Sequence, residues 1–439
     1  MATRKSFTAT AAATFGTNVG VAVISLLNVL VTARILGPGG RGELALLTTI
    51  AILTASLAAF GLYEANANIG GREPGKRGAL AANSLVLALA LGGAAAALVA
   101  ALVVVFPALG GGADPLLQAL ALAAIPVLIL QSGLMTLIQS QYGFAATNAA
   151  WLLSPSMNLA LNGALAAFGL LTVGTAVLVW IAGQVAATAL LAWHAVRGLE
   201  GVPRPDAPLA RRMLSFGSRT HLGRVMTMGN YRLDQWFVGA IAGHRELGLY
   251  SVAVAWAEAL FYLPTALGMV QRPDLVRASA SEAGAWTAMV FRAALLFTAL
   301  LAVGLVIAAP ILCVGVFGED FRGSIDDLRV LAFGAFGIVA LKLLGNALIA
   351  QGKPMRAYAG VAVAFVTTVA LDLLLIPSHG GIGAAIASTA AYTAGGVAIL
   401  VVFSRALGRR PVELVPRGNE LGPLLRQLRA VVTARPATR

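Results

Sequence analysis

Of the chain's 439 residues, 59% are hydrophobic and only 11% are charged, against about 25% charged in an ordinary soluble domain. A soluble core cannot bury that much apolar surface, so the composition excludes a soluble globular protein and indicates a membrane protein. The net charge of +13 would suggest nucleic-acid binding in a soluble chain. Here the basic residues lie mainly between apolar segments, so we expect no nucleic-acid partner.

Apolar segments long enough to cross a bilayer follow one another along nearly the whole chain. Each crossing needs about 20 mostly apolar residues, and we predict about twelve helices. In chain order they are expected at 14–36, 43–66, 79–106, 116–138, 147–168, 172–196, 213–242, 247–271, 285–317, 326–350, 356–376 and 381–404. The connections are short and rich in glycine, proline and charge. The sequence therefore predicts an all-α polytopic membrane protein without an extramembrane domain.

Basic residues are distributed unevenly between alternate connections. With the N-terminus inside, the outer connections hold only Arg41, Arg245, Arg322 and Arg329, and the remaining connections and the tail hold many more. This asymmetry predicts a multi-pass protein of the bacterial cytoplasmic membrane with both termini in the cytoplasm. The apolar stretch that follows the basic N-terminus has no small-residue cleavage site at the expected distance. We expect an uncleaved first helix there.

The second half of the chain echoes the first at a nearly constant offset. Arg41-Gly42-Glu43-Leu44 is echoed by Arg245-Glu246-Leu247-Gly248, and Leu161-Asn162 is echoed by Leu371-Asp372. The echoes predict two homologous six-helix lobes, 1–200 and 201–405, around a central cavity. A basic cytoplasmic tail follows at 406–439. Its leucines between 421 and 432 recur at helical spacing and suggest a helix on the membrane surface.

The seventh predicted helix carries polar residues that an apolar environment would not tolerate. An arginine at the centre of a membrane helix costs about 2.5–3.5 kcal/mol on insertion scales. At about 100° per residue, one face about 100° wide collects His221, Arg224, Tyr231, Arg232 and Gln235. Lipid cannot adjoin this face. It must line a wet cavity or meet carboxylates of other helices, and we predict that it binds substrate.

The alternative to substrate binding is internal pairing of these charges. Arg224 or Arg232 could pair with Glu258, and Arg34 with Asp234. Arginines within the predicted helices outnumber carboxylates, however, and the surplus charge favours an anionic ligand. Guanidinium matches phosphate oxygens in a bidentate arrangement. Asp234 and Glu258 are the predicted ion-coupling residues.

The other polar residues of the predicted helices carry less weight. Asp372 is expected near the outer membrane interface, and Lys342 and Arg292 are expected to extend to the cytoplasmic face. The histidines at helix ends have no partner at i+4, and Cys313 is the only cysteine, so we predict no metal site. We likewise expect no catalytic residue and no cofactor.

Three stretches carry a resemblance to a known family. They are Thr32–Leu44 with its Arg34-Ile35-Leu36-Gly37-Pro38 core, Tyr231-Arg232-Leu233-Asp234, and Glu246-Leu247-Gly248-Leu249-Tyr250-Ser251. Together they resemble polysaccharide flippases of the multidrug/oligosaccharidyl-lipid/polysaccharide exporter superfamily. The similarity extends to about Arg405. The polar tail differs from peptidoglycan-precursor flippases, which typically have two further C-terminal helices.

The resemblance implies a fold and a function. The fold is that of the multidrug and toxin extrusion transporters, with two six-helix bundles. The function is translocation of an undecaprenyl-diphosphate-linked oligosaccharide to the outer leaflet by alternating access, for polysaccharide biosynthesis. Carried over to this chain, the family's basic cavity residues are Arg34, Arg224 and Arg232. The expected partners are the lipid-linked glycan, membrane lipids and other polysaccharide-assembly proteins.

Two further functions compete with this interpretation. A multidrug or cation exporter of the same fold needs carboxylates in its cavity, whereas the surplus here is basic. A membrane polymerase or ligase needs a sizeable outer loop with catalytic groups, and the connections here are short. We therefore expect a transporter and not an enzyme.

Overall fold

The structure, a computed structural model, describes residues 4–416 apart from 198, 200 and 201. These residues form helices and short connections and contain no strand. The helices are α1 (Arg4–Ala58), α2 (Leu62–Arg72), α3 (Arg77–Val105), α4 (Pro115–Ala123), α5 (Ile125–Ser140), α6 (Phe144–Ala167), α7 (Val173–Val196), α8 (Ala207–Phe237), α9 (His244–Ala257), α10 (Tyr262–Arg277), α11 (Ala280–Pro310), α12 (Ser324–Ala350) and α13 (Pro354–Leu407). Each of the twelve predicted ranges falls on one or more of these helices. The tail helix expected between 421 and 432 lies outside the described residues.

Helix α13 contains two predicted membrane crossings, and α1 contains one and most of the next, which continues into α2. In α1 the first crossing ends at Gly37 (φ 65°, ψ −179°), and in α13 it ends at Gly380 (φ 55°, ψ −133°). Both glycines occupy the left-handed region of φ, which side chains disfavour. The connections expected at these points are therefore single-residue kinks, and helix resumes at once on the far side. This places residues 38–43 within α1 instead of a loop.

Eight helical segments of the described chain are long and apolar enough to cross a membrane. The segment in α13 holds two predicted crossings, and the segment in α1 holds one and most of the next. The long helices α6 and α8 are not among the eight, because amide and charged side chains lower their hydropathy. Helices α6 and α8 are thus long enough to span a membrane but more polar than the other long helices.

Unusual backbone angles recur along the chain at an offset close to that of the sequence echoes. Positive φ angles recur at positions separated by 206 to 211 residues, in the pairs Gly37 and Gly243, Gly112 and Gly318, Tyr142 and Gly352, and Gly169 and Gly380. Such angles mark the ends and kinks of helices. The two halves therefore bend at equivalent points.

The backbone of α1 just after the Gly37 kink lies against the start of α9, which follows Gly243, the equivalent position in the repeat. A Cβ atom on Gly42 would lie 1.7 Å from the carbonyl oxygen of His244, and one on Gly248 would lie 1.9 Å from that of Pro38. Both contact pairs link α1 with α9 and are separated by the repeat offset. Only glycine permits backbones to approach this closely.

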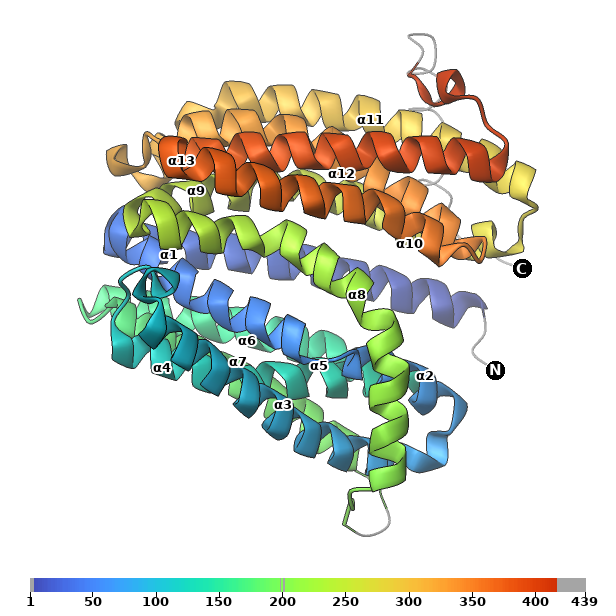
Figure 1. Cartoon of the computed structure of the whole chain (residues 1–439), viewed down its shortest axis with the longest axis horizontal. Helices are drawn as coiled ribbons and strands as arrows, with labels where there is room; N and C mark the ends of the chain where they lie inside the picture. Colours follow the sequence, from blue (N-terminus) through green and yellow to red (C-terminus); the bar gives the residue numbers. More distant parts are fainter. Residues whose placement is uncertain (1–3, 198, 200–201, 417–439) are drawn as a thin grey trace. The chain divides into compact units, whose positions relative to one another are not determined.

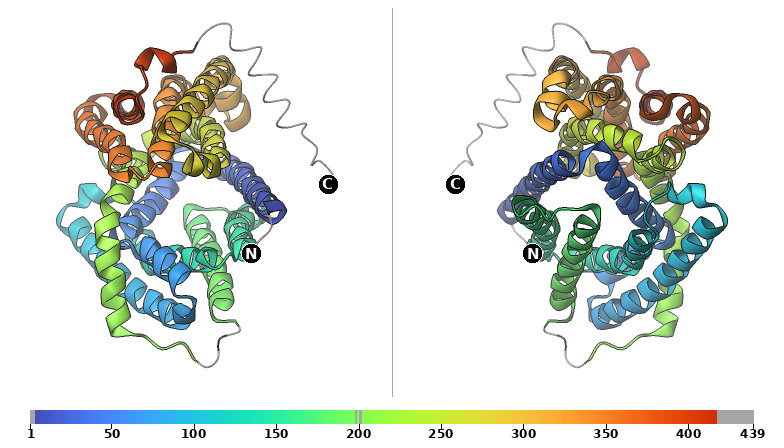
Figure 2. Two further views of the ribbon diagram at one scale, coloured as in Figure 1. Left: turned by 90° about the vertical axis from the view of Figure 1, so that its right-hand side faces the viewer. Right: turned by 90° about the vertical axis from the view of Figure 1, so that its left-hand side faces the viewer.

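The described chain divides into two compact units. Unit 1 comprises 1–255, 311–324 and 372–384, and unit 2 comprises 256–310, 325–371 and 385–439. These boundaries differ from those of the predicted lobes, and the lobes with their central cavity stay a prediction. Figure 1 shows α3, α5, α6 and α7 of unit 1 running alongside one another, and Figure 2 views them more nearly along their axes.

Each unit has an apolar core of its own. In unit 1 the buried side chains of Leu44, Leu47 and Val177 join α1 to α7. In unit 2 Leu343 and Phe403 belong to a larger cluster that joins α11, α12 and α13. In water, burial of apolar surface contributes about 25 cal/mol per Å² to the free energy of folding. Lipid gives no such driving force between helices, and there van der Waals contacts replace it.

Glu73 joins the end of α2 to the start of α8 outside the membrane-spanning segments. Its carboxylate accepts a hydrogen bond from Arg212 and pairs with Lys76 at 3.2 Å. The bonds from Arg212 and Lys76 lower the pKa of Glu73 from 4.5 to about 2. A carboxylate with a lowered pKa stabilises the fold above its unfolded pKa, and this stabilisation is lost as the pH falls from about 4.5 toward 2.

We expect Glu73→Gln to lower the Tm of the detergent-solubilised protein slightly at pH 7 and to flatten its decline between pH 5 and 3. Differential scanning fluorimetry across this pH range measures both effects. Glu319→Gln is the matched control, because Glu319 pairs with Arg322 one turn away on the same segment and joins no two helices. If the parent protein and Glu73→Gln lose Tm in parallel on acidification, the Glu73 pair does not stabilise the junction.

Candidate functional site

The predicted polar face of α8 lies against residues 49–63 of α1 and α2. His221 Nε2 lies 2.8 Å from the carbonyl oxygen of Leu57, and its ring stacks on Phe60 with centroids 5.6 Å apart. The guanidinium carbon of Arg224 lies 4.6 Å from the centroid of the Tyr63 ring. Further along, the Thr49 hydroxyl donates to Gln235 Oε1 at 3.3 Å. This face therefore adjoins protein, and several of its groups have partners there.

Arg34 is bonded to the end of another helical segment of unit 1. Its Nε donates to the carbonyl oxygen of Val316 at 2.7 Å, and one terminal nitrogen donates to that of Gly315 at 3.3 Å. Gly315 ends the π-helical segment η5 (Ile311–Gly315). Carbonyls at a helix end carry partial negative charge, which a cation stabilises. The pairing of Arg34 with Asp234 that the sequence left open is replaced by these two bonds.

Arg232 lies near a second arginine that the sequence interpretation had placed in an outer connection. One terminal nitrogen of Arg232 donates to the carbonyl oxygen of Tyr231 at 3.2 Å. Arg41 lies close enough to Arg232 for their charges to repel, and its buried Nε has no hydrogen-bond partner in the described chain. The Gly37 kink places Arg41 here, on the second part of α1. Two guanidinium groups from α1 and α8 therefore lie in one region of unit 1.

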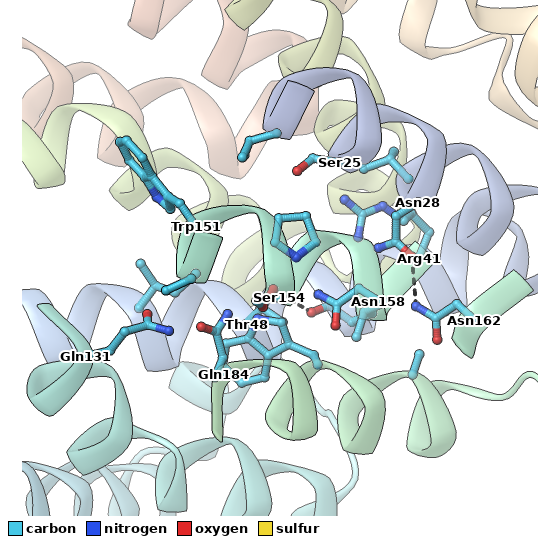
Figure 3. A pocket seen from close by; sticks show the side chains of 18 of the residues that line it. Ser25, Asn28, Arg41, Thr48, Gln131, Trp151, Ser154, Asn158, Asn162 and Gln184 are labelled. Carbon is cyan, nitrogen blue, oxygen red and sulfur yellow. Dashed lines mark hydrogen bonds between the residues drawn. The ribbon is translucent and has the colours of Figure 1, made fainter. Parts of the chain in front are cut away.

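A cavity of about 370 Å³ opens within unit 1 between α1, α5, α6 and α7. Figure 3 shows its polar lining. The lining shares a chemical character, because it is rich in amides, hydroxyls and indoles: Ser25, Asn28, Thr48, Gln131, Trp151, Ser154, Asn158, Asn162, Trp180 and Gln184. Among the described residues, Arg41 is the one charged residue that lines it, and no carboxylate does. Within the described part of the chain, this cavity is thus polar and cationic.

The cavity has two distinct ends. Figure 3 shows Arg41 toward one end, with Asn28 and Asn162, whereas Gln131 and Trp151 lie toward the other. At the first end, the amide nitrogen of Asn162 donates to Asn28 Oδ1 at 2.9 Å. Asn162 is 2% exposed, and its own Oδ1 has no hydrogen-bond partner in the described chain.

A pair of carboxyl groups occupies the equivalent place in the second half of the repeat. Asp234 and Asp372 follow Asn28 and Asn162 at the repeat offset. Asp234 accepts a hydrogen bond from the Tyr250 hydroxyl at 2.6 Å, and Asp372 lies within electrostatic range of Asp234. Asp372 is fully buried, and neither of its oxygens has a hydrogen-bond partner in the described residues. Asp372 is thus buried within the protein, and its expected depth near the outer membrane interface stays a prediction.

Glu258, the other predicted ion-coupling residue, lies in unit 2. It is the first residue of the short segment η4 (Glu258–Phe261) and lies close enough to Lys342 for their opposite charges to attract. Lys342 is thus within electrostatic range of a carboxylate, and its expected extension to the cytoplasmic face stays a prediction. Among the described residues, no group of three His, Cys, Asp or Glu side chains could hold a metal ion.

Arg41, the amides of the cavity and Asp372 are functional candidates that the sequence interpretation missed. One signal was available on α6, where Ser154, Asn158 and Asn162 recur every four residues and so share one face. A second was the echo between Leu161-Asn162 and Leu371-Asp372, in which an amide in the first half occupies the position equivalent to a carboxyl group in the second half. No local signal distinguished Arg41 from a loop arginine.

A family model described as polysaccharide biosynthesis protein matches residues 31–326. No curated protein matches the chain.

Solved structures share the fold at low identity. The lipid II flippase MurJ in an inward closed conformation has a TM-score of 0.76 at 12% identity, covering 95% of this chain and 91% of its own. An inward-facing multidrug resistance MATE family transporter of the MOP superfamily has a TM-score of 0.72 at 15% identity, covering 88% and 95%. A MOP superfamily transporter from Pyrococcus furiosus has a TM-score of 0.59 at 14% identity, covering 91% and 95%. The fold is thus the all-α polytopic fold of these transporters.

Proposed function

Because the chain belongs to the polysaccharide biosynthesis protein family, we propose that it is a flippase for an undecaprenyl-diphosphate-linked oligosaccharide. It carries this lipid from the inner to the outer leaflet of the bacterial cytoplasmic membrane by alternating access, with both termini in the cytoplasm. The resemblance in fold to a lipid II flippase supports a lipid-linked cargo. Other polysaccharide-assembly proteins are its expected partners.

The observation that carries this proposal is the cavity in unit 1. A diphosphate with attached sugars needs cations and neutral hydrogen-bonding groups, and the cavity supplies both through Arg41 and its amides. Arg232 brings a second guanidinium into electrostatic range of Arg41. Guanidinium groups bind phosphate oxygens in a bidentate arrangement. A diphosphate, with acceptor oxygens on each phosphate, is suited to that position.

The alternative is a multidrug or cation exporter, and the resemblance in fold to multidrug transporters is compatible with it. An organic cation would favour carboxylates and apolar surface in its binding cavity. The lining described here has no carboxylate and is rich in amides. The lipid-linked glycan is therefore the better match.

Coupling to an ion is assigned to the carboxyl groups of unit 1. In this proposal the coupling ion binds at Asp372, which is fully buried with both oxygens lacking partners in the described residues, and at Asp234, which lies within electrostatic range of it. Glu258 in unit 2 is the second candidate. Arg34 and Arg224 have protein partners here, and in this proposal they hold the diphosphate only after exchanging those partners during the cycle.

Transport by the purified protein in vesicles tests the proposal. Proteoliposomes that contain a short-chain analogue of the polyprenyl-diphosphate-linked oligosaccharide should expose its sugar to an external lectin in a protein-dependent manner. The same vesicles should not concentrate or extrude a fluorescent organic cation such as ethidium. Ethidium transport without lipid flipping would establish the exporter function instead.

A further inference from the structure

We propose that the cavity between α1, α5, α6 and α7 is a binding subsite for the sugar attached directly to the diphosphate. The inference rests on the proposed function and names the part of the substrate that this cavity recognises. The ligand class is a neutral, hydroxyl-rich pyranose, held next to the anion bound by Arg41. The flippase would thus recognise the glycan through contacts to the sugar ring, and the lipid carrier through the charge of its diphosphate.

The amides of the lining suit a ring that carries several hydroxyl groups. An amide side chain has two donors and an acceptor with two lone pairs, and a sugar hydroxyl can donate and accept at once. Five amides line the cavity: Asn28, Gln131, Asn158, Asn162 and Gln184. The buried Oδ1 of Asn162 has no hydrogen-bond partner in the described chain, which leaves an acceptor that a ligand hydroxyl can satisfy. An unsatisfied buried acceptor costs about 1–3 kcal/mol, so its satisfaction favours binding.

Two indoles contribute apolar surface beside these amides. Trp151 is 41% exposed and Trp180 is 9% exposed, so Trp151 is the more accessible of the two residues. An indole combines a broad apolar face with one donor, and it can pack against the C–H face of a pyranose while the hydroxyls at the ring edge meet the amides. A hydrocarbon ligand would instead leave the amides without partners.

The two ends of the cavity give the ligand an orientation. Arg41 lies toward one end, whereas Trp151 and Gln131 lie toward the other (Figure 3). The diphosphate therefore lies at the Arg41 end, and the sugar begins beside Asn162, whose Oδ1 accepts from one of its hydroxyls, and extends toward Trp151. The volume of about 370 Å³ lies at the low end of the range of about 300–1,000 Å³ typical of small-molecule sites. It accommodates the first part of the glycan, and the remainder extends outside.

Equilibrium binding to the purified full-length protein can separate sugar recognition from carrier recognition. The probes are undecaprenyl diphosphate and the same lipid with one N-acetylhexosamine, both in detergent micelles, measured by microscale thermophoresis. In the parent protein the sugar-bearing lipid should bind more tightly. Asn158→Ala and Trp151→Ala should each weaken binding of the sugar-bearing lipid roughly threefold to tenfold, the effect of about one neutral contact. Binding of undecaprenyl diphosphate should not change.

Two control variants come from the same bundle. Asn148 lies on α6 and bonds to Thr14, and Trp193 lies on α7 with its ring 51% exposed. Neither lines the cavity, so Asn148→Ala and Trp193→Ala should leave binding of both lipids at parent values.

The outcomes distinguish this inference from the proposed function. If the parent protein binds both lipids equally, or if the cavity variants weaken both lipids to the same extent, the sugar subsite is overturned while the flippase proposal stands. If the parent protein binds neither lipid, the proposed function itself fails. A cavity variant that loses its thermal transition is replaced by Gln184→Ala, measured with the same two probes.

Discussion

Arg41→Ala and Arg232→Ala should each weaken binding of undecaprenyl diphosphate roughly 10- to 100-fold, and the double variant should abolish flipping. A charge-assisted hydrogen bond contributes about 1.5–3 kcal/mol, and about 1.4 kcal/mol corresponds to a tenfold change in affinity. Both guanidinium groups lie in one region of unit 1, and Arg41 lines the polar cavity. Binding in micelles and flipping in proteoliposomes measure the two effects.

Conservative variants separate charge from geometry at the same positions. Arg232→Lys should recover transport only in part, because an ammonium group lacks the two-pronged geometry of guanidinium. Arg322→Ala is the matched control, since Arg322 is exposed and pairs with Glu319 one turn away. Arg34→Ala and Arg224→Ala should have smaller effects on binding than Arg41→Ala, because carbonyl oxygens and the Tyr63 ring already engage these two side chains.

Normal transport by both Arg41→Ala and Arg232→Ala would show that these arginines are structural and that the diphosphate binds elsewhere. Protein amount in the membrane and the Tm of each variant must match the parent protein for this conclusion. Loss of flipping with unchanged binding would place the arginines in the conformational cycle instead of the binding site.

Asp372→Asn should uncouple transport from the ion gradient without destabilising the protein. The first half of the repeat shows what such a pair looks like with amides, because Asn162 donates to Asn28 at 2.9 Å. Asp372→Asn replaces a buried group whose oxygens lack partners by an amide that can donate to Asp234. The variant should therefore match or exceed the parent Tm while losing the carboxyl group that binds the coupling ion.

Flipping measured with and without an imposed pH gradient tests this prediction. The parent protein should respond to the gradient, and Asp372→Asn and Asp234→Asn should not. Glu258→Gln, in unit 2, is the comparison variant, and a changed response there would transfer the coupling role to Glu258. A response to a sodium gradient in the parent protein, absent in Asp372→Asn, would identify sodium as the coupling ion. A parent-like response of Asp372→Asn to every gradient would contradict a coupling role for this pair.

Hydropathy along the sequence was enough to predict the class of protein and its helices. Each predicted crossing falls on a helix because the need for about 20 apolar residues is a local property of the chain. The repeat was also visible, since it survives as echoed residues such as Leu161-Asn162 and Leu371-Asp372. Positive φ angles in the backbone recur at a similar offset. The polar face of α8 was predictable for the same reason, because helical periodicity alone places His221, Arg224 and Gln235 together.

Only the tertiary structure decided which polar residues meet and which are left without partners. Periodicity assigns a residue to a helix face but does not say what that face contacts. The sequence did not show that helix packing buries Asp372 completely, within electrostatic range of Asp234. Arg41 was predicted to lie in a loop, because a kink at a single glycine and a loop cannot be distinguished in the sequence. The cavity is assembled from single amides on four helices, and because their proximity depends on packing between distant segments, it had no signature in any one segment.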